Sequence, residues 1–206
     1  MGGIGIIDIG LGNIDSVARA LGHLGYDSSL CGDPQELDNL DKIIFPGVGS
    51  FGAASKLLRT TGFKTAIREK VLKEGFPILG ICLGMQLLAE HGEEGSGGDG
   101  LGLVSGEVKL HRGTNLGVSI PHIGWNDVKH AGGILFKGIP SETAFYFVHS
   151  YELIVQGSQS VRVATCDHGV EFVAAIETEN VFGVQFHPEK SQEYGLALLK
   201  NFIENA

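Results

Sequence analysis

The segment Phe76-Pro77-Ile78-Leu79-Gly80-Ile81-Cys82-Leu83-Gly84-Met85-Gln86-Leu87-Leu88 places a cysteine directly after an apolar run. Residues 77–81 predict a buried strand, and residues of helical character follow Cys82 without an intervening loop. Gly80 and Gly84 flank Cys82 in the glycine-x-nucleophile-x-glycine pattern of a sharp strand-to-helix turn. Such a turn needs glycines because neighbouring side chains would collide. The segment therefore predicts a nucleophile at the carboxyl edge of a sheet.

Cysteine suits this position chemically. A helix N-terminus favours the thiolate, which is the reactive form of the side chain. Gln86 follows one helical turn later on the same face, so we expect its amide to line the pocket beside the sulfur. The alternative is that Cys82 is a small buried hydrophobe, as free cysteines in apolar runs often are. A catalytic role also requires a base and a group that orients the base.

The composition is that of a globular protein, and we expect one domain over residues 1–206. With 43% apolar and 19% charged residues, the chain can bury a sizeable core and does not resemble a disordered protein. The net charge of −9, without an offsetting basic cluster, argues against a nucleic-acid surface.

The cysteines and the first residues indicate a compartment. Cys31, Cys82 and Cys166 are odd in number and lack the spacing of metal ligands, and they fit a reducing cytoplasm. Residues 1–9 are apolar but contain Asp8 and lack a basic flank, so we expect a first strand and no signal peptide. No apolar run is long enough to cross a membrane. We expect a cytoplasmic protein without a metal or a cofactor.

Strand and helix patterns alternate in the first half of the chain. The expected strands are residues 4–9, 30–31, 42–45 and 77–81, and the expected helices are residues 14–24, 63–71 and a segment after Cys82. Residues 46–52 are expected to end the third strand. This alternation predicts a parallel sheet with helices on both faces and function at the carboxyl ends of its strands.

After residue 100 the pattern changes to short strands joined by turns. The expected strands are residues 106–110, 144–148, 152–155, 161–166, 171–177 and 181–185. We interpret them as an antiparallel extension that continues the main sheet, followed by a helix over residues 191–204. We interpret residues 92–100 as a solvated connector. The predicted fold class is α/β, with a central, mostly parallel sheet flanked by helices and extended by antiparallel strands.

The segment Val184-Gln185-Phe186-His187-Pro188-Glu189-Lys190-Ser191 supplies a candidate base. Pro188 disfavours the helical region for His187, so the chain is extended there, and residues two apart point the same way. His187 and Glu189 are therefore expected to face one pocket. One ring nitrogen would bind the carboxylate and the other would accept a proton from a thiol. The alternative is that Glu189 is only a favourable charge near a helix start.

A third element is an oxyanion hole, because attack on a carbonyl creates a negatively charged oxygen that backbone N–H groups stabilise. Pro46-Gly47-Val48-Gly49 ends a neighbouring strand and would present one N–H group, from Val48 or Gly49. Leu83, directly after Cys82, would present the second. The alternative for the first is an ordinary glycine turn.

Together these segments resemble the class I, cysteine-triad glutamine amidotransferases. The motifs Pro-Gly-Val-Gly at 46–49, Gly-Ile-Cys-Leu-Gly-Met-Gln at 80–86 and Phe-His-Pro-Glu-Lys-Ser at 186–191 all match. The resemblance covers essentially the whole chain and narrows to the glutaminase subunits that supply ammonia to a cyclase. It narrows on these segments: Gly12-Asn13 with Ser16-Val17, residues 46–52, Pro121-His122-Ile123-Gly124-Trp125-Asn126 and Tyr146-Phe147-Val148-His149-Ser150-Tyr151.

The resemblance implies a reaction and its residues. Cys82 would attack the side-chain amide of L-glutamine, and His187, oriented by Glu189, would pass the proton to the leaving ammonia. The resulting glutamyl thioester would be hydrolysed to glutamate. The implied glutamine-binding residues are Gly47, Gln86, His149, Ser150 and Tyr151.

The resemblance also implies a partner, a cyclase subunit with a (β/α)8 barrel, in a heterodimer. The cyclase would use the ammonia to make imidazole glycerol phosphate and an aminoimidazole carboxamide ribonucleotide, for histidine and purine synthesis. Asn13, Pro121, His122 and Trp125 would face this partner and gate the oxyanion strand. A core position is the alternative for Trp125, and we interpret Tyr146 and Phe147 as core residues.

Other functions stay open at this point. Residues 108–115 lack the basic-aromatic ending of many members, and Asp15 lies where a basic residue is frequent, so a paralogue that supplies ammonia for amidino sugars of surface polysaccharides is one alternative. A cysteine peptidase or γ-glutamyl hydrolase on the same scaffold is another alternative, but the related peptidase-like group usually has histidine directly after the cysteine, where this chain has Leu83. A binding protein without activity would not need the complete triad.

Overall fold

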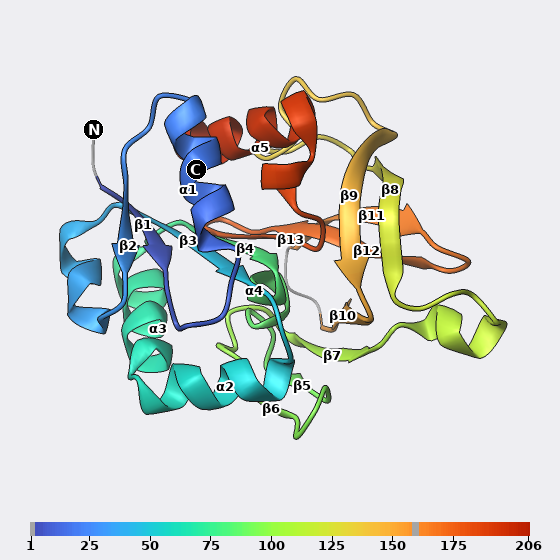
Figure 1. Ribbon diagram of the computed structural model, residues 1–206, viewed down its shortest axis with the longest axis horizontal. Helices are drawn as coiled ribbons and strands as arrows, with labels where there is room; N and C mark the ends of the chain where they lie inside the picture. Colours follow the sequence, from blue (N-terminus) through green and yellow to red (C-terminus); the bar gives the residue numbers. More distant parts are fainter. Residues whose placement is uncertain (1–2, 158–160) are drawn as a thin grey trace.

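A nine-stranded sheet forms the centre of the computed structural model, which describes residues 3–157 and 161–206 (Figure 1). In spatial order its strands are β2 (Ser28–Cys31), β1 (Ile4–Ile7), β3 (Lys42–Gly47), β4 (Ile78–Cys82), β13 (Val181–Val184), β12 (Glu171–Glu177), β11 (Arg162–Asp167), β8 (His122–Lys129) and β9 (Thr143–His149). Neighbours from β2 to β13 are parallel, and neighbours from β13 to β9 are antiparallel. This confirms the predicted fold class.

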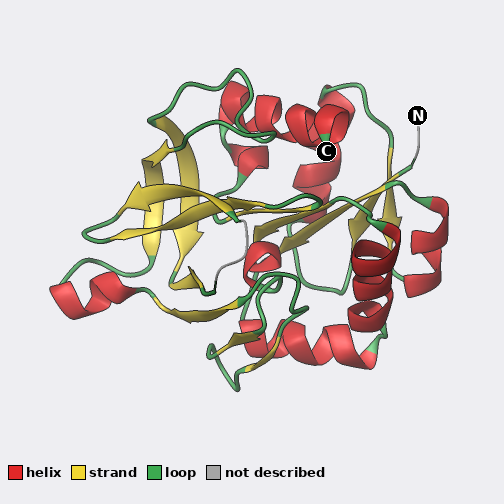
Figure 2. Cartoon of the chain, turned by 180° about the vertical axis from the view of Figure 1, so that it is seen from behind, coloured by secondary structure: helices red, strands yellow, loops and turns green. Residues whose placement is uncertain are grey.

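Helices cover both faces of the parallel half (Figures 1 and 2). The helices are α1 (Ile14–His23), α2 (Phe51–Thr60), α3 (Phe63–Glu74), the single turn α4 (Leu83–Gln86) and α5 (Gln192–Asn205), with 3-10 turns η1 (Pro34–Asn39), η2 (Arg112–Leu116) and η3 (Pro188–Lys190). Because side chains alternate along a strand, Ile44 packs in the cluster that contains α1 and α5, whereas Ile43 and Phe45 pack in the cluster that contains α2 and α3. Among the described residues, no helix has the length and apolar character needed to span a bilayer.

Two of the strands that were predicted to continue the main sheet, residues 106–110 and 152–155, do not do so, and this part of the prediction is wrong. They belong to a separate four-stranded sheet made of β10 (Tyr151–Val155), β7 (Gly106–Leu110), β5 (His91–Gly92) and β6 (Gly98–Asp99). Strand β9 ends at His149, and β10 begins after Ser150 and pairs antiparallel with β7. The chain therefore leaves the edge of one sheet and enters another within two residues, a change of partner that the strand pattern alone does not reveal.

Two helix and strand boundaries also differ from the prediction. Strand β3 runs through Pro46 to Gly47, because its ladder with β1 has already ended at Ile44 and no neighbour on that side needs the missing N–H. Helix α2, which was not predicted, begins at Phe51, inside the stretch 46–52 that was expected to form a break. Its first N–H, from Phe51, is donated to the Glu94 carboxylate at 2.9 Å. This cap comes from a distant loop, so local sequence does not announce it.

Residues 92–100 are therefore more than the solvated connector that we expected. They join the short strands β5 and β6, and the Glu94 carbonyl also accepts the Gly52 N–H at 3.2 Å. Strand β8 was not predicted either. Its residues alternate between buried and accessible positions, with Val128 buried and Trp125 exposed.

The antiparallel half of the sheet curls back toward the parallel half. The His187 N–H donates to the Tyr146 carbonyl at 2.9 Å, so β9 meets the chain that follows β13. Stacked rings of Phe145 and Phe186, with centroids 4.2 Å apart, fill the inside of the curl. Because β9 runs in the same direction as β13 and β4, its carboxyl end arrives at the edge where those two strands end. That edge carries the site.

Candidate active site

The nucleophile elbow has the geometry that its glycines predict. Cys82 ends β4 and begins α4 with a φ of 55°, which is strained for a residue with a side chain. A Cβ atom on Gly84 would lie 1.7 Å from the Phe45 carbonyl oxygen, and one on Gly80 would lie 2.7 Å from the backbone of Gly84. Glycine is required at both positions, because only bare backbone fits between β3 and the elbow.

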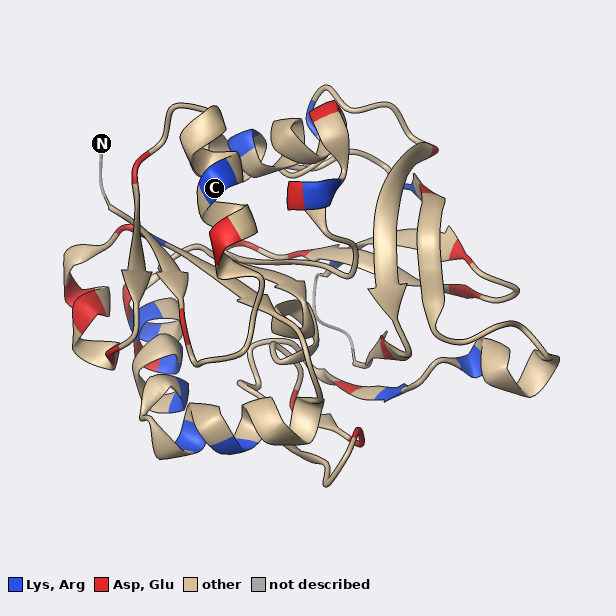
Figure 3. Ribbon diagram, in the orientation of Figure 1, with Lys and Arg blue, Asp and Glu red and all other residues tan. Residues whose placement is uncertain are grey.

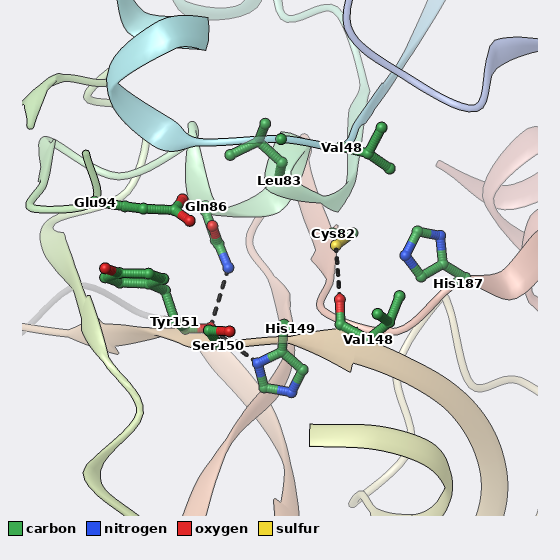
Figure 4. A pocket seen from close by; sticks show the side chains of 11 residues that line it. Val48, Cys82, Leu83, Gln86, Glu94, Val148, His149, Ser150, Tyr151 and His187 are labelled. Carbon is green, nitrogen blue, oxygen red and sulfur yellow. Dashed lines mark hydrogen bonds between the residues drawn. The ribbon is translucent and has the colours of Figure 1, made fainter. Parts of the chain in front are cut away.

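Cys82 and His187 line the same cavity, of about 220 Å3 (Figure 4). His187 Nδ1 lies 2.8 Å from Glu189 Oε1, and both side chains are almost fully buried. Within residues 3–157 and 161–206, the other ring nitrogen, Nε2, makes no hydrogen bond of regular geometry. The nucleophile, base and orienter that were predicted from segments 105 positions apart are thus brought together.

The charge state of His187 reflects its neighbours. Burial by itself lowers the pKa of this imidazole, but the nearby Cys82 sulfur and Glu189 carboxylate outweigh burial and raise the pKa to about 9. A ring that holds a proton strongly in this setting can receive one from a thiol.

A buried glutamine contacts the nucleophile and was not predicted. Gln185 Nε2 lies 3.7 Å from Cys82 Sγ, and Gln185 Oε1 accepts a hydrogen bond from Gln86 Nε2 at 3.0 Å. The sulfur lies 3.8 Å from the Val148 carbonyl oxygen. Gln185 precedes His187 by two residues in an extended chain, so the alternation that placed Glu189 near the site could have placed this amide there as well.

The cavity gathers most of the residues predicted for oxyanion and glutamine binding. Its lining consists of Val48, Gly49, Cys82, Leu83, Gln86, Glu94, Val148, His149, Ser150, Tyr151 and His187. Gly47 is not in this lining. It pairs with Cys82 in the ladder between β3 and β4 and packs under the elbow against Leu83 and Gly84.

Glu94 is the acidic residue of the lining and was not predicted. It comes from the loop over residues 92–100, and its carboxylate is directed toward Gln86 (Figure 4). One carboxylate oxygen, Oε2, accepts the Phe51 N–H of helix α2. No local pattern distinguishes Glu94 from the neighbouring Glu93, so no signal in the sequence could have found it.

The segment after β9 is held by hydrogen bonds on two sides. The carbonyl of Tyr151 lies 3.1 Å from Gln86 Nε2 and 2.9 Å from His149 Nδ1. Burial lowers the pKa of His149 to about 3, so its ring is neutral near pH 7. Ser150, between them, lines the cavity.

The residues predicted to face a partner lie in different settings. Pro121 is exposed, and Trp125 is 47% exposed, so the core alternative for Trp125 is wrong. Asn13 is half-buried before α1 and accepts a hydrogen bond from Ser16 Oγ at 2.8 Å. The adjacent Gly12 lies close to Pro46, so this loop neighbours the Pro-Gly-Val-Gly turn.

Two expectations about β8 and β9 need correction. His122 does not face outward, because its side chain is buried and contacts His149. Tyr146 is only half-buried, since it pairs with Trp125 across the strands and shares its outer face, with ring centroids 6.1 Å apart. Phe147, on the opposite face, is fully buried as predicted.

The chain is similar to known proteins over nearly its whole length. The family described as "Glutamine amidotransferase class-I" matches residues 5–206. A protein of Moorella thermoacetica named "Imidazole glycerol phosphate synthase subunit HisH" is 49% identical, with 98% of this chain and 94% of that protein covered. A protein of Pyrococcus furiosus with the same name is 47% identical, with 97% of each covered.

The fold also matches solved structures. The structure described as PurLQS from Thermotoga maritima superposes with a TM-score of 0.76 over 98% of both chains, at 19% identity. Since a family-wide match spans nearly the whole sequence and full-length relatives are close to half identical, this chain belongs to the class-I glutamine amidotransferase family.

Proposed function

We propose that this chain hydrolyses L-glutamine and delivers the ammonia to a cyclase, as the glutaminase subunit of an imidazole glycerol phosphate synthase in histidine biosynthesis. One observation carries the reaction: Cys82, on its strained elbow, shares a cavity with His187, whose Nδ1 lies 2.8 Å from Glu189. The names of the relatives support the pathway.

In the proposed mechanism the sulfur of Cys82 attacks the side-chain amide carbon of glutamine. His187 accepts the thiol proton through Nε2, and Glu189 holds the ring through Nδ1. The tetrahedral intermediate collapses to a glutamyl thioester, and His187 gives its proton to the departing ammonia. Water, deprotonated by His187, then attacks the thioester and releases glutamate and the free thiol.

The negatively charged oxygen of the intermediate needs backbone donors. We propose the N–H of Leu83, the first residue of α4, as one donor and the N–H of Val48 or Gly49 as the other. All three residues line the cavity. The side chain of Val48 is 41% exposed and Gly49 has a φ of 114°, so this turn is little constrained by packing and a partner can adjust it.

The polar rim fits the two ends of an amino acid. Both hydrogens of Gln86 Nε2 are taken by Tyr151 and Gln185, so Gln86 Oε1 remains as an acceptor. We propose that this oxygen and the Glu94 carboxylate bind the α-ammonium group, and that the backbone of Ser150 and Tyr151 binds the α-carboxylate. The cavity is smaller than the roughly 300–1,000 Å3 of pockets for drug-sized ligands, as suits a small substrate.

An apolar strip leads from the site to the outer face of β8 and β9. Ile123 is 61% exposed and pairs with Val148, whose carbonyl faces the Cys82 sulfur. Trp125 pairs with Tyr146 on the same face. Figure 3 shows few charged residues on the middle of these strands, whereas Lys and Arg gather on α2 and α3.

We propose that the (β/α)8 cyclase docks on this strip and forms a heterodimer with the chain, which acts as one amidotransferase domain over residues 1–206. Exposed aromatic and aliphatic side chains beside a site are typical anchors of a protein interface. We also propose a cytoplasmic location, supported by the three cysteines, all of them free and buried.

The test is to purify the chain with the histidine-pathway cyclase and to measure glutamate release and imidazole glycerol phosphate formation. Cys82→Ala should abolish both with glutamine and leave formation with added ammonia intact. Glutamate release that persists in Cys82→Ala would contradict the mechanism. Failure to stimulate this cyclase, with intact glutaminase activity, would instead favour a paralogous partner such as an amidino-sugar enzyme.

A further inference from the structure

Two buried histidines form a chain of hydrogen bonds that ends at the Tyr151 carbonyl, in the segment that we propose binds glutamine. His122 Nδ1 lies 3.1 Å from His149 Nε2, and His149 Nδ1 lies 2.9 Å from the Tyr151 carbonyl oxygen. Both imidazoles are less than 10% exposed. His149 and Tyr151 line the cavity, whereas His122 lies behind them and does not.

The direction of each hydrogen bond follows from the last acceptor. A carbonyl oxygen can only accept, so His149 carries its proton on Nδ1 and its Nε2 is an acceptor. That nitrogen must therefore accept a hydrogen bond from the N–H at His122 Nδ1. His122 Nε2 is then an acceptor in turn, and the Asn126 amide nitrogen lies 3.3 Å from it. Each neutral ring is thus held in one of its two tautomers.

The amide of Asn126 anchors the far end of this chain. Its nitrogen also donates to the Asp167 carbonyl at 2.8 Å, and its oxygen accepts the Asp127 N–H at 2.9 Å. These two bonds fix which way the amide points, so His122 Nε2 is presented with N–H and not with oxygen. The sequence of donors therefore runs one way, from β8 to the Tyr151 carbonyl.

The surroundings keep both rings neutral. Burial is the largest influence and lowers the pKa of His122 to about 4, and the nearby rings of His111 and His168 add to the effect. The same two rings face His149. The charged groups beside this cluster are Arg112 and Glu152, which form an ion pair with each other. A proton added to either imidazole of the chain would set two N–H groups against each other.

We infer that His122 is a positioning residue for glutamine binding: it holds His149 in the tautomer that donates to the Tyr151 carbonyl, and so fixes residues 149–151 against the substrate. This inference rests on the proposed function, in which the backbone of Ser150 and Tyr151 binds the α-carboxylate. It also explains why β8 presents a histidine inward, at a position where an apolar side chain would serve packing alone.

Two substitutions at position 122 separate hydrogen bonding from packing. Phe in place of His122 keeps an aromatic ring between Phe147 and His168, with which His122 stacks at centroid distances of 4.8 and 4.0 Å, but it cannot donate to His149. Asn keeps a nitrogen donor close to the position of Nδ1 but loses the ring. A role in packing alone predicts that Phe is tolerated better than Asn, and the positioning role predicts the reverse.

The experiment measures L-glutamine binding by titration calorimetry in a Cys82→Ala background, where the substrate is not consumed. His122→Phe should weaken binding about tenfold, because the buried Nε2 of His149 loses its donor, whereas His122→Asn should stay within about threefold of the parent. Thermal unfolding of each variant shows whether it is folded. NMR of 15N-labelled histidine in the unmodified chain gives a readout that needs no substitution, and His122 and His149 should both be protonated on Nδ1.

The outcomes separate the two levels of the argument. No glutamine binding by the Cys82→Ala chain would overturn the proposed function and this inference together. Binding that His122→Phe leaves unchanged would overturn the positioning role alone, and so would weaker binding by Asn than by Phe. A His149 ring protonated on Nε2 in the unmodified chain would overturn it without any variant.

Discussion

The parallel and antiparallel halves of the main sheet reach the cavity with different kinds of residue. The parallel half contributes Cys82 at the end of β4, His187 after β13 and the turn at Val48 after β3. The antiparallel half contributes His149 at the end of β9, followed by Ser150 and Tyr151. We therefore assign bond breaking to the first half and binding of the α-carboxylate to the second, while Gln86 and Glu94 bind the α-ammonium group.

The two halves also hold their polar residues differently. In the parallel half the Cys82 sulfur and the Glu189 carboxylate outweigh burial and raise the pKa of His187, whereas in the antiparallel half burial, with a smaller effect of neighbouring imidazoles, lowers the pKa of His122 and His149. We therefore propose that the same kind of side chain serves as a base in one half and as a fixed hydrogen-bond donor in the other. Substitutions of the triad in the first half should lower kcat, and those of His122 or His149 in the second should raise KM.

Removing the sulfur tests the parallel half most severely. Cys82→Ala should lower kcat by about 10⁴-fold or more, because no other group can form the thioester. Steady-state glutamate release measures this, and calorimetry should show that glutamine still binds. Glutamate release that persists in Cys82→Ala would contradict the assignment of bond breaking to the parallel half.

Glu189→Gln should have the next largest effect. The amide cannot hold His187 in the required tautomer, so kcat should fall by about 10²-fold or more with little change in KM. Glu193 is exposed in the first turn of α5, so Glu193→Gln is a matched control that should behave like the parent. A rise in KM with kcat preserved would contradict the division of labour between the halves.

The stability of the chain should fall on both sides of a maximum near pH 6.5. The folded-state pKa of His187 is raised to about 9, so its contribution is complete below pH 6.5 and is lost as the pH rises to 9. The folded-state pKa values of His122 and His149 are lowered to about 4 and about 3, so their contribution is complete above pH 6.5 and is lost as the pH falls.

On each side of the maximum, the free energy of unfolding should fall by on the order of 3 kcal/mol per histidine, since each pKa unit corresponds to about 1.4 kcal/mol. We call these two sides the acid limb and the alkaline limb. Urea unfolding at a series of pH values measures both limbs. Glu189→Gln should flatten the alkaline limb and His122→Asn the acid limb. If one substitution flattened both limbs, the two halves would not titrate separately.

The ion pair between Arg112 and Glu152, which directly follows residues 149–151, stabilises this part of the chain. Arg112 Nε and Nη2 each lie 3.0 Å from the carboxylate of the fully buried Glu152. Arg112→Ala should reduce the free energy of unfolding by about 2 kcal/mol, because the carboxylate keeps its burial but loses its cation, while the partial exposure of Arg112 limits the loss. Chemical denaturation should show almost no change for the exposed Arg59→Ala.

The smallest expected effect on the chain itself is at Trp125. Because this side chain is half exposed, Trp125→Ala should lower the free energy of unfolding by less than about 1 kcal/mol. Phe147→Ala, on the buried face of the neighbouring strand, should lower it by about 3–5 kcal/mol. Affinity for the cyclase should follow the opposite order, and a cyclase affinity unaffected by Trp125→Ala would remove the outer face as the docking surface.

Much of the parallel half and of the triad could be predicted, because both depend on local patterns. The apolar run before Cys82 and the extended step from His187 to Glu189 are each set by a few adjacent residues. Their meeting follows from the rule that parallel strands end at one edge.

The remainder depends on contacts that no short segment encodes. Helix α2 starts where Glu94, more than 40 residues away, supplies its cap. The exchange of sheets at Ser150 depends on β7 being the available partner. His122 was expected to face outward because its motif was interpreted as a surface; its burial follows from the curl of β8 around Phe172 and its neighbours.

The bare backbone at Gly84 has a consequence for how such chains diverge. The height of the sulfur above the sheet is set by main-chain atoms of the elbow resting on the Phe45 carbonyl, and not by the identity of any side chain. Core residues around it can be exchanged over long evolutionary times without moving the nucleophile. One methyl group at position 84, by contrast, would displace the elbow from the Phe45 carbonyl, so tolerance to substitution should drop sharply at that single site.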